Sequence, residues 1–401
     1  MSKLRVYTLV PLLTVAVLSA CTSSATPEIQ NVGSSDISVE DAAAATVKDS
    51  ITPVSVQRVE VYTAAKLQAI EMTQVARNSV VHSWVLPEDA SVKFAVIGDY
   101  GLWEPDLVHE SFQRLGGKQG QAPTIRSPQV SLLVAEMIHE WDVDLILTTG
   151  DNNYFDGTAH EIDRNIGRLY HRYIGNYQGS YSDTAGNSGS PENRFFPTLG
   201  NHDWHTAGAL PYLEYFTLPG NERYYDFVKG NVHFWALDSD SHEPDSNLEG
   251  GVQAEWLKRG LAASNEKYNI VYFHHPPYNS LFNSDSNCPD CVAMRWPFES
   301  WGADLVIAGH SHHYERVFRN GLNYVTNGLG GHTTRHGFSR EFDGDGNMIT
   351  TFGSGPPIEG SVGRFVADYG AMRIYATEQV LKVQFVTLGG VVVDNFTLFP
   401  K

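Results

Sequence analysis

Side chains that can bind metal ions recur in this sequence directly after short apolar runs. These candidate ligands are Asp99, Asp151, Tyr154, Asn201, His274, His310 and His312. Imidazole, carboxylate, amide and phenolate groups suit borderline-to-hard metal ions and do not form a thiolate site. The set is too large for one ion, but it suits two ions that share a bridging carboxylate. The residue types therefore predict a binuclear metal centre.

The elements that must position these ligands can be read from the pattern around them. The apolar runs at 93–97, 145–149 and 305–308 predict buried strands, and 195–199 is a less regular example. Each run ends at a glycine that is followed at once by a candidate ligand. Glycine lets the backbone turn sharply, so the next side chain stands at the strand's carboxyl end. Such strand ends are where open α/β sheets build binding sites.

Helices and further strands alternate with these runs. Apolar spacing predicts helices over residues 130–141, 162–173 and 252–261. Further strands are expected at residues 232–237, 270–273, 323–326, 372–375, 380–386 and 391–398. Gly389-Gly390 is typical of the turn of a closing hairpin. Trp296, Phe298 and Trp301 are expected in the core. The pattern predicts a layered α/β sandwich.

Five short motifs contain the candidate ligands. They are G-D-Y-G at 98–101, G-D-N-N-Y at 150–154, G-N-H-D at 200–203, V-Y-F-H at 271–274 and G-H-S-H at 309–312. This ordered set resembles the calcineurin-like metallophosphoesterases, and specifically the purple acid phosphatases. The resemblance runs from about residue 92 to the C-terminus and implies a layered sandwich of two mixed β-sheets flanked by helices. His275 adjoins the fourth motif, but the V-x-x-H spacing selects His274.

The resemblance also implies cofactors and roles. Asp99, Tyr154 and His312 would hold Fe(III), because phenolate is a hard anionic donor. The remaining expected ligands of a divalent ion (Fe, Zn or Mn) are Asn201, His274 and His310, with Asp151 bridging the two metals. The ions would make the centre locally positive within an acidic protein, which suits a phosphate ester.

The implied activity is that of a binuclear metal-dependent phosphomonoesterase, an acid phosphatase in which a metal-bound hydroxide attacks phosphorus in line. His202 would contact the phosphate and protonate the leaving group; the alternative is a structural histidine hydrogen-bonded to Asp203. Two other functions stay open. One is a phosphodiesterase or nucleotidase on the same two-metal scaffold, and the other is a non-catalytic surface binding lipoprotein.

The flanks of the motifs carry three smaller predictions. Unlike plant-type members, residues 279–290 contain no histidine, and Cys288 and Cys291 stand there instead. These cysteines are expected to form a local disulfide near the site entrance, with free thiols or a redox-active or metal-binding pair as alternatives. His332 is expected in a loop role, although it could line the cleft. Glu315 and Arg316 are expected to form a structural ion pair.

The N-terminal sequence predicts a bacterial cell-envelope address. Lys3 and Arg5 precede an apolar run at 6–18 that has the length of a signal-peptide core. The run ends in L-S-A-C, which resembles a lipoprotein lipobox with Cys21 as the lipidated residue. An ordinary signal peptide with an incidental cysteine is the alternative. Membrane attachment is expected through the lipid alone, facing the periplasm or the exterior.

Composition supports this organisation. The chain has 401 residues, 42% of them hydrophobic and 18% charged, which is ordinary for a globular protein and excludes a collagen or a coiled coil. The net charge of −18 argues against a nucleic-acid partner. The expected divisions are a lipoprotein signal peptide at 1–20, a flexible tether at 21–90 with a helix over 58–79, and one catalytic domain at 91–401.

Overall fold

The computed structural model describes residue 87 and residues 89–102, 127–183, 186–282, 286–332, 338–342, 348–352, 358–365 and 368–400. Three sequence predictions fall outside these ranges: the signal peptide at 1–20, the lipidated Cys21 and the helix over 58–79. Most of the expected tether also lies outside them. These expectations stay predictions. Within the described residues, no helix is both long and apolar enough to cross a membrane.

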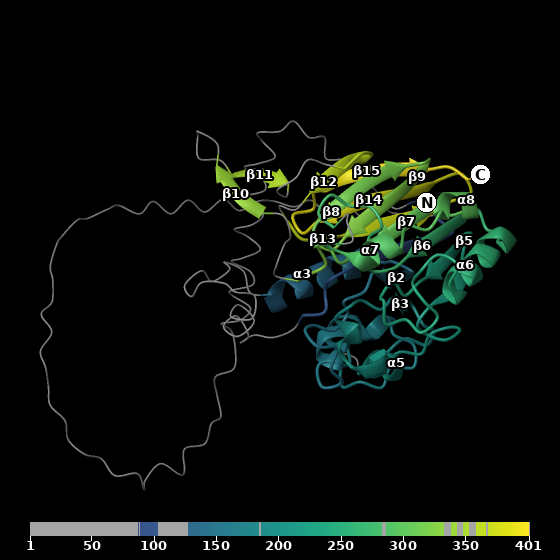
Figure 1. Cartoon of the computed structure of the whole chain (residues 1–401). Helices are drawn as coiled ribbons and strands as arrows, with labels where there is room; N and C mark the ends of the chain where they lie inside the picture. Colours follow the sequence, from purple (N-terminus) through teal and green to yellow (C-terminus); the bar gives the residue numbers. More distant parts are fainter. Residues whose placement is uncertain are drawn as a thin grey trace, which may run out of the picture. The chain divides into compact units, whose positions relative to one another are not determined.

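One of the two large sheets has the strand order β15-β14-β13-β1-β2-β3 (Figure 1). Its strands are β1 (Val92–Ile97), β2 (Leu145–Thr148), β3 (Phe195–Pro197), β13 (Gly370–Ala376), β14 (Leu381–Thr387) and β15 (Val392–Leu398). The first three strands run parallel to one another, whereas the last three pair antiparallel. Gly390, at φ 74°, lies in the predicted turn between β14 and β15.

The other large sheet has the order β12-β8-β9-β7-β6-β5-β4. Its strands are β4 (Tyr225–Lys229), β5 (Val232–Ala236), β6 (Tyr268–Tyr272), β7 (Leu305–Ala308), β8 (Tyr314–Arg319), β9 (Leu322–Asn327) and β12 (Ser361–Phe365). β5, β6, β7 and β9 are parallel, and β4, β8 and β12 are antiparallel to their neighbours. A separate two-stranded pair joins β10 (Phe338–Phe342) and β11 (Met348–Phe352).

Helices connect the parallel strands. They are α3 (Ser127–Glu140), α4 (Arg168–Tyr170), α5 (Leu210–Tyr215), α6 (Val252–Ala263), α7 (Pro289–Ala293) and α8 (Phe298–Trp301). The stretch 162–173 is helical throughout, as predicted, but it is not one regular α-helix: it consists of a π-helical turn at Asp163–Gly167, the short α4 and a 3-10 turn at His171–Tyr173. Gly167 stands at the first junction, and glycine weakens a helix interior.

Two hydrophobic cores account for the layering. On β5, Val232 and Phe234 face the core shared with the first sheet, whereas Trp235 and Leu237 belong to a second core on the opposite side. Side chains alternate between faces along a strand, so one strand serves both cores. Full burial of each large apolar side chain contributes about 1.5–3 kcal/mol.

The second core is closed by helices. Leu257 and Leu261 of α6 pack there, together with the buried Trp296 and Phe298, while Trp301 packs partly buried against it. Two mixed β-sheets are thus flanked by helices, which confirms the predicted α/β sandwich.

Candidate metal centre

Strand ends of both sheets supply the candidate ligands. Asp99, Asp151 and Asn201 follow β1, β2 and β3, and His274 and His310 follow β6 and β7. The carboxyl ends of parallel strands meet at one edge of a sheet. Residues far apart in the sequence therefore come within hydrogen-bonding distance of one another, as the distances below show.

A first donor group joins Asp99, Tyr154 and His312. The Tyr154 hydroxyl lies 3.2 Å from Asp99 Oδ1 and 3.3 Å from His312 Nε2. Asp99 Oδ1 and His312 Nε2 are themselves 3.2 Å apart. All three side chains are buried. The group thus combines a phenol, a carboxylate and an imidazole around one point.

A second donor group joins Asn201, His274 and His310. Asn201 Oδ1 lies 3.0 Å from His274 Nε2 and 3.1 Å from His310 Nδ1. The two imidazole nitrogens are 3.3 Å apart. This group has no carboxylate of its own and contains only groups that can be neutral.

Asp151 connects the two donor groups. Its Oδ2 accepts a hydrogen bond from the Tyr154 hydroxyl at 2.7 Å, and its Oδ1 lies 3.4 Å from His274 Nε2. Each oxygen of this one carboxylate therefore faces a different group. A bridging position between two metal ions requires this arrangement.

The hydrogen bonds of His274 test whether the second group fits a metal ion. His274 Nδ1 lies 2.7 Å from the Thr149 carbonyl oxygen, which can only accept, so Nδ1 carries a proton. In the neutral ring, Nε2 then presents a lone pair toward Asn201 Oδ1, which is another acceptor. A metal ion between the two atoms would accept both lone pairs, and a proton on Nε2 would also satisfy the contact. A backbone carbonyl that orients a histidine in this way is typical of metal ligands.

The electrostatics of the second group also favour a cation. Burial lowers the pKa of His274, but the carboxylates of Asp151 and Asp99 outweigh it and raise that pKa above its ordinary value. The pKa of His310 is lowered well below its ordinary value by burial and by His275 and His274, so its ring is neutral. The carboxylates thus stabilise positive charge at a place where a neutral imidazole offers its lone pair.

The two anionic donors of the centre behave differently. Burial raises the pKa of Asp151, but His274, His202 and a backbone N–H outweigh it and leave that pKa below its usual range. The pKa of Tyr154 is raised well above its ordinary value by burial and by Asp151 and Asp99. Asp151 is therefore ionised at neutral pH, whereas the Tyr154 phenol keeps its proton unless a strong cation displaces it.

The backbone around the strand ends is held in an unusual conformation. Asp99, Asp151 and His310 have φ values of 55°, 51° and 64°. Left-handed backbone costs such residues free energy and is concentrated at functional sites. The expectation that glycine supplies the turn applies to Gly150, at φ 82°; Gly200 instead leaves space, because a Cβ there would lie 2.3 Å from the Asp151 backbone nitrogen.

The sequence profile of the family described as calcineurin-like phosphoesterase matches residues 92–314, which is more than half of the chain. The chain belongs to the calcineurin-like phosphoesterase family. This confirms the family that the motifs predicted, and the matched stretch contains every candidate ligand.

Named relatives of this phosphoesterase are acid phosphatases. It is 22% identical over 281 residues to tartrate-resistant acid phosphatase type 5 of Oryctolagus cuniculus, covering 64% of the chain and 78% of the relative. It is 34% identical over 118 residues to purple acid phosphatase 15 of Arabidopsis thaliana, covering 27% of the chain and 21% of that protein. Family and relatives support a metal-dependent hydrolase acting on phosphoester bonds.

A solved structure shares the fold. The purple acid phosphatase PPD1 from seeds of yellow lupin (Lupinus luteus) matches with a TM-score of 0.55 and 16% identity. The match covers 78% of this phosphoesterase and 55% of the lupin chain. At this identity the match shows the common architecture of two sheets.

His202 borders the first donor group of the phosphoesterase. Its Nε2 lies 4.0 Å from Asp151 Oδ2, and its ring centroid is 4.4 Å from that of Tyr154. Its Nδ1 donates to the Phe155 carbonyl at 2.6 Å. The alternative in which His202 bonds to Asp203 is wrong, because Asp203 Oδ2 instead accepts from Gly200 and Asn152. Asp203 thus stabilises the loop by hydrogen bonds to Gly200 and Asn152 and does not orient the His202 ring.

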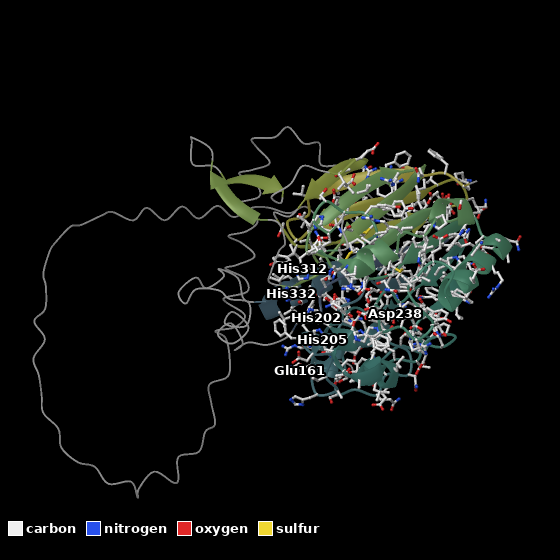
Figure 2. All side chains as sticks on the ribbon, in the orientation of Figure 1. Glu161, His202, His205, Asp238, His312 and His332 are labelled. Atoms are coloured by element: carbon white, nitrogen blue, oxygen red, sulfur yellow. A yellow bond between two sulfur atoms is a disulfide. The ribbon has the colours of Figure 1, made fainter. Side chains whose placement is uncertain are left out.

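His332 lies at the site, in agreement with the alternative that it lines the cleft and not with a loop role alone. Its ring centroid lies 4.4 Å from that of Tyr154 and 4.5 Å from that of His312 (Figure 2). Its backbone N–H donates to the Asp99 carbonyl at 2.9 Å. His332 therefore lines the first donor group. The run G-L-G-G-H directly after β9 was the available signal, since it repeats the strand–glycine–ligand pattern.

The cysteine pair adjoins the second donor group. Cys288 and Cys291 form a disulfide at the start of α7, and their sulfurs lie within 4.8 Å of a ring nitrogen of His310. The phosphoesterase thus has a covalent loop against a candidate ligand. His275 packs against the second donor group, with its ring centroid 4.8 Å from that of His274 and 4.6 Å from that of His310, while its Nδ1 lies 2.9 Å from Ser239 Oγ.

The expected ion pair between Glu315 and Arg316 is wrong. Adjacent residues of β8 point to opposite faces. Arg316 pairs with Asp394 at 2.6 Å, while Glu315 is buried and accepts from Ser280 and His313. Glu315 therefore ties the loop after His274 to the strand after His312.

Proposed function

We propose that this chain is a binuclear metal-dependent phosphomonoesterase of the purple acid phosphatase type. The observation that carries the proposal is the carboxylate of Asp151, which presents one oxygen to each donor group. Two metal ions about 3.5–4 Å apart can clamp one phosphate group. A single-metal site would not need two converging groups joined by a shared carboxylate.

The charges of the two donor groups indicate which metal ion each would bind. Asp99 and Tyr154 give the first donor group one carboxylate and one phenol that can ionise, so it suits Fe(III). The second group, Asn201 with His274 and His310, is neutral and suits a divalent ion such as Fe, Zn or Mn. Asp151 contributes its charge to both.

The residues of the chain divide the remaining work. When bound, the two ions polarise the phosphate and supply the nucleophile for in-line attack. Hydrolysis breaks the ester P–O bond, adds hydroxide to phosphorus and returns a proton to the leaving oxygen. His202 can deliver that proton from Nε2 when its ring carries protons on both nitrogens, with the Nδ1–H held by the Phe155 carbonyl. The water molecule that supplies the hydroxide replaces the proton lost from the ring. Asp203 fixes the loop that carries His202.

The decisive experiment combines metal analysis with a panel of esters. Protein loaded with iron and zinc should contain about one iron and one divalent ion per chain and show a visible absorption band. It should hydrolyse an aryl phosphate faster than a bis-aryl phosphate across acidic pH. Faster hydrolysis of the diester would favour the phosphodiesterase alternative. A metal-loaded protein without turnover of any ester would indicate the non-catalytic alternative, and a colourless zinc protein would exclude Fe(III) bound to Tyr154.

We also propose that a lipid on Cys21 attaches the enzyme to the bacterial cell envelope. The support is the sequence of residues 3–21, with its cations, apolar run and L-S-A-C end. The full-length chain expressed in a bacterium should partition with membranes and incorporate labelled fatty acid. Cys21→Ser should abolish the label and release the enzyme. Unchanged partitioning and labelling of Cys21→Ser would refute the anchor.

A further inference from the structure

A mostly apolar cavity of about 600 Å³ lies beside His202 and is not part of either donor group. Its wall includes Trp204, His205, Leu213, Arg223, His242 and Pro244. Small-molecule sites usually have volumes of about 300–1,000 Å³ and mainly apolar walls with a few polar groups. The cavity therefore has the size and chemistry of a binding site.

The position of the cavity relates it to the metal centre. His205 Nδ1 lies 2.9 Å from the Phe155 carbonyl oxygen, which also accepts from His202. The His202 and His205 ring centroids are 4.7 Å apart (Figure 2). His202 therefore contacts both His205 on the cavity wall and, at 4.0 Å, the bridging candidate Asp151, which relates the cavity to the side of the proposed proton donor.

The topology gives the same result. Trp204 and His205 follow β3, and His242 and Pro244 follow β5. Arg223 precedes β4, which pairs antiparallel with β5 and so begins where β5 ends. Of these strand ends, that of β3 also carries the candidate ligand Asn201, and β5 is the parallel neighbour of β6, whose end carries His274.

The aromatic part of the wall is held firmly. The Trp204 indole Nε1 donates to the buried Asp238 at 2.9 Å. The His242 ring lies almost parallel to the indole, with an interplanar angle of 22° and centroids 5.9 Å apart. A fixed indole presents apolar area with little conformational entropy to lose on binding.

The basic side chains of the cavity wall already have carboxylate partners. Arg223 pairs with Glu243 and Asp245 at 2.9 and 3.0 Å. His242 Nδ1 lies 2.6 Å from Asp240 Oδ1, and His205 Nδ1 lies 3.7 Å from Asp156. A phosphate-bearing or carboxylate-bearing group would meet cations that have carboxylate partners. The wall therefore favours an uncharged group over an anionic one.

We propose that this cavity binds the leaving group of the substrate, and that it selects flat, uncharged aromatic alcohols esterified to phosphate. The proposal rests on the proposed function, because the leaving oxygen must lie at His202 while its ring occupies the cavity. Contact energy from the ring then contributes to holding the ester in line with the nucleophile. Because the cations of the wall already have carboxylate partners, we expect a leaving group that carries further phosphates to bind less well there than an uncharged aromatic alcohol.

The first test places a large side chain in the cavity by substituting a residue at its exposed edge. Ala207 lines the cavity and is exposed, so Ala207→Trp places an indole inside without disturbing the core. The matched control is Ala262→Trp, at an exposed position on α6. We expect Ala207→Trp to lower the ratio of kcat/KM for 4-nitrophenyl phosphate to that for ethyl phosphate about tenfold. Ala262→Trp should leave the ratio unchanged.

A second variant and a binding measurement keep the two proposals distinguishable. His242→Ala removes an exposed imidazole from the cavity wall and should lower the ratio of kcat/KM for 4-nitrophenyl phosphate to that for ethyl phosphate about threefold. The ¹⁹F resonance of 4-fluorobenzyl alcohol should broaden with wild-type protein and not with Ala207→Trp. Broadening without turnover of any ester would retain the cavity and refute the proposed function. Ester turnover with the same kcat/KM ratio in wild type and Ala207→Trp, and no broadening of the ¹⁹F resonance, would refute binding of the leaving group in the cavity and retain the proposed function.

Discussion

The two donor groups of the metal centre lie side by side but differ in charge and in surroundings. The first contains Asp99 and Tyr154 and is covered by two aromatic rings, those of His202 and His332. The second contains an amide and two imidazoles and has the Cys288–Cys291 disulfide against His310. The difference teaches that one arrangement of strand ends can carry two donor groups of unlike charge, because each loop supplies different donor atoms.

The largest expected effect comes from removing what the groups share. Asp151→Asn keeps the shape of the side chain but deletes the charge that faces both groups. We expect loss of both metal ions and a fall in kcat/KM of roughly a thousandfold. Elemental analysis and ester hydrolysis measure this. Asp142→Asn is the matched control, since Asp142 is exposed and asparagine tolerates its φ of 50°. Retention of one ion by Asp151→Asn would show that the carboxylate does not bridge.

Tyr154→Phe separates the groups. It removes the phenol from the first group and leaves the second intact, so we expect the visible band to disappear while the divalent ion remains. Activity should fall about 10- to 100-fold. Tyr170→Phe is the control: its buried hydroxyl has no hydrogen-bond partner in the described structure, so the band should persist. Equal loss of both ions in Tyr154→Phe would contradict the division into two groups.

Glu315 tests how the groups are tied together. Burial raises its pKa, but hydrogen bonds from His313, Ser280 and Ser361 outweigh this and lower it to about 2. A carboxyl whose pKa is lower in the folded state stabilises the fold above its ordinary pKa of 4.5, and this stabilisation is lost as the pH falls toward 2.

We therefore expect the unfolding free energy of the wild type to decrease between pH 4.5 and 2 by about 3 kcal/mol from this group. Glu315→Gln should lack this part of the pH dependence and should be less stable at pH 7. Urea unfolding at several pH values measures both quantities. Glu249→Gln, at an exposed position, is the control. An unchanged pH profile in Glu315→Gln would show that the buried carboxyl does not couple to folding.

The smallest effect is expected at His332. Its ring contacts with Tyr154 and His312 contribute about 0.5–1.5 kcal/mol each. His332→Ala should shift the visible band and lower the iron affinity of the first group by less than about tenfold, without changing the divalent site. His139→Ala removes a comparable stacked ring, 5.6 Å from Tyr173, and should not move the band. A shift of equal size in both variants would mean that the ring contact at Tyr154 is not specific.

Much of the fold follows from local pattern. The runs at 93–97, 145–149 and 305–308 contain strands, because continuous apolar residues that end at a glycine fit the interior of a parallel sheet. The apolar spacing at 162–173 predicted a regular α-helix, but the helix type changes along this stretch. The spacing of apolar residues contains no information about Gly167 or about the packing around it. The Glu315–Arg316 pairing failed because strand geometry sends neighbours to opposite faces.

The candidate site, like the fold, was predicted only in part from the sequence. Motif spacing selected the ligand types, and the structure brings all of them together, although metal occupancy and identity stay predictions. For His332 the sequence favoured a loop role over a position at the cleft, and the cavity beside Trp204 was not predicted, because both depend on how loops from β3, β5 and β9 meet. Nothing in the local sequence specifies such a meeting.

By itself, the sequence determined that strand ends would carry carboxylate, phenol, amide and imidazole groups, since apolar runs, glycines and polar residues follow one another along the chain. Only the tertiary structure decided that Asp151 faces two groups with its two oxygens and that His274 presents Nε2. Those facts depend on side-chain orientation and on contacts across two sheets. The orientation of His274, for example, is set by Thr149, which lies 125 positions away in the sequence.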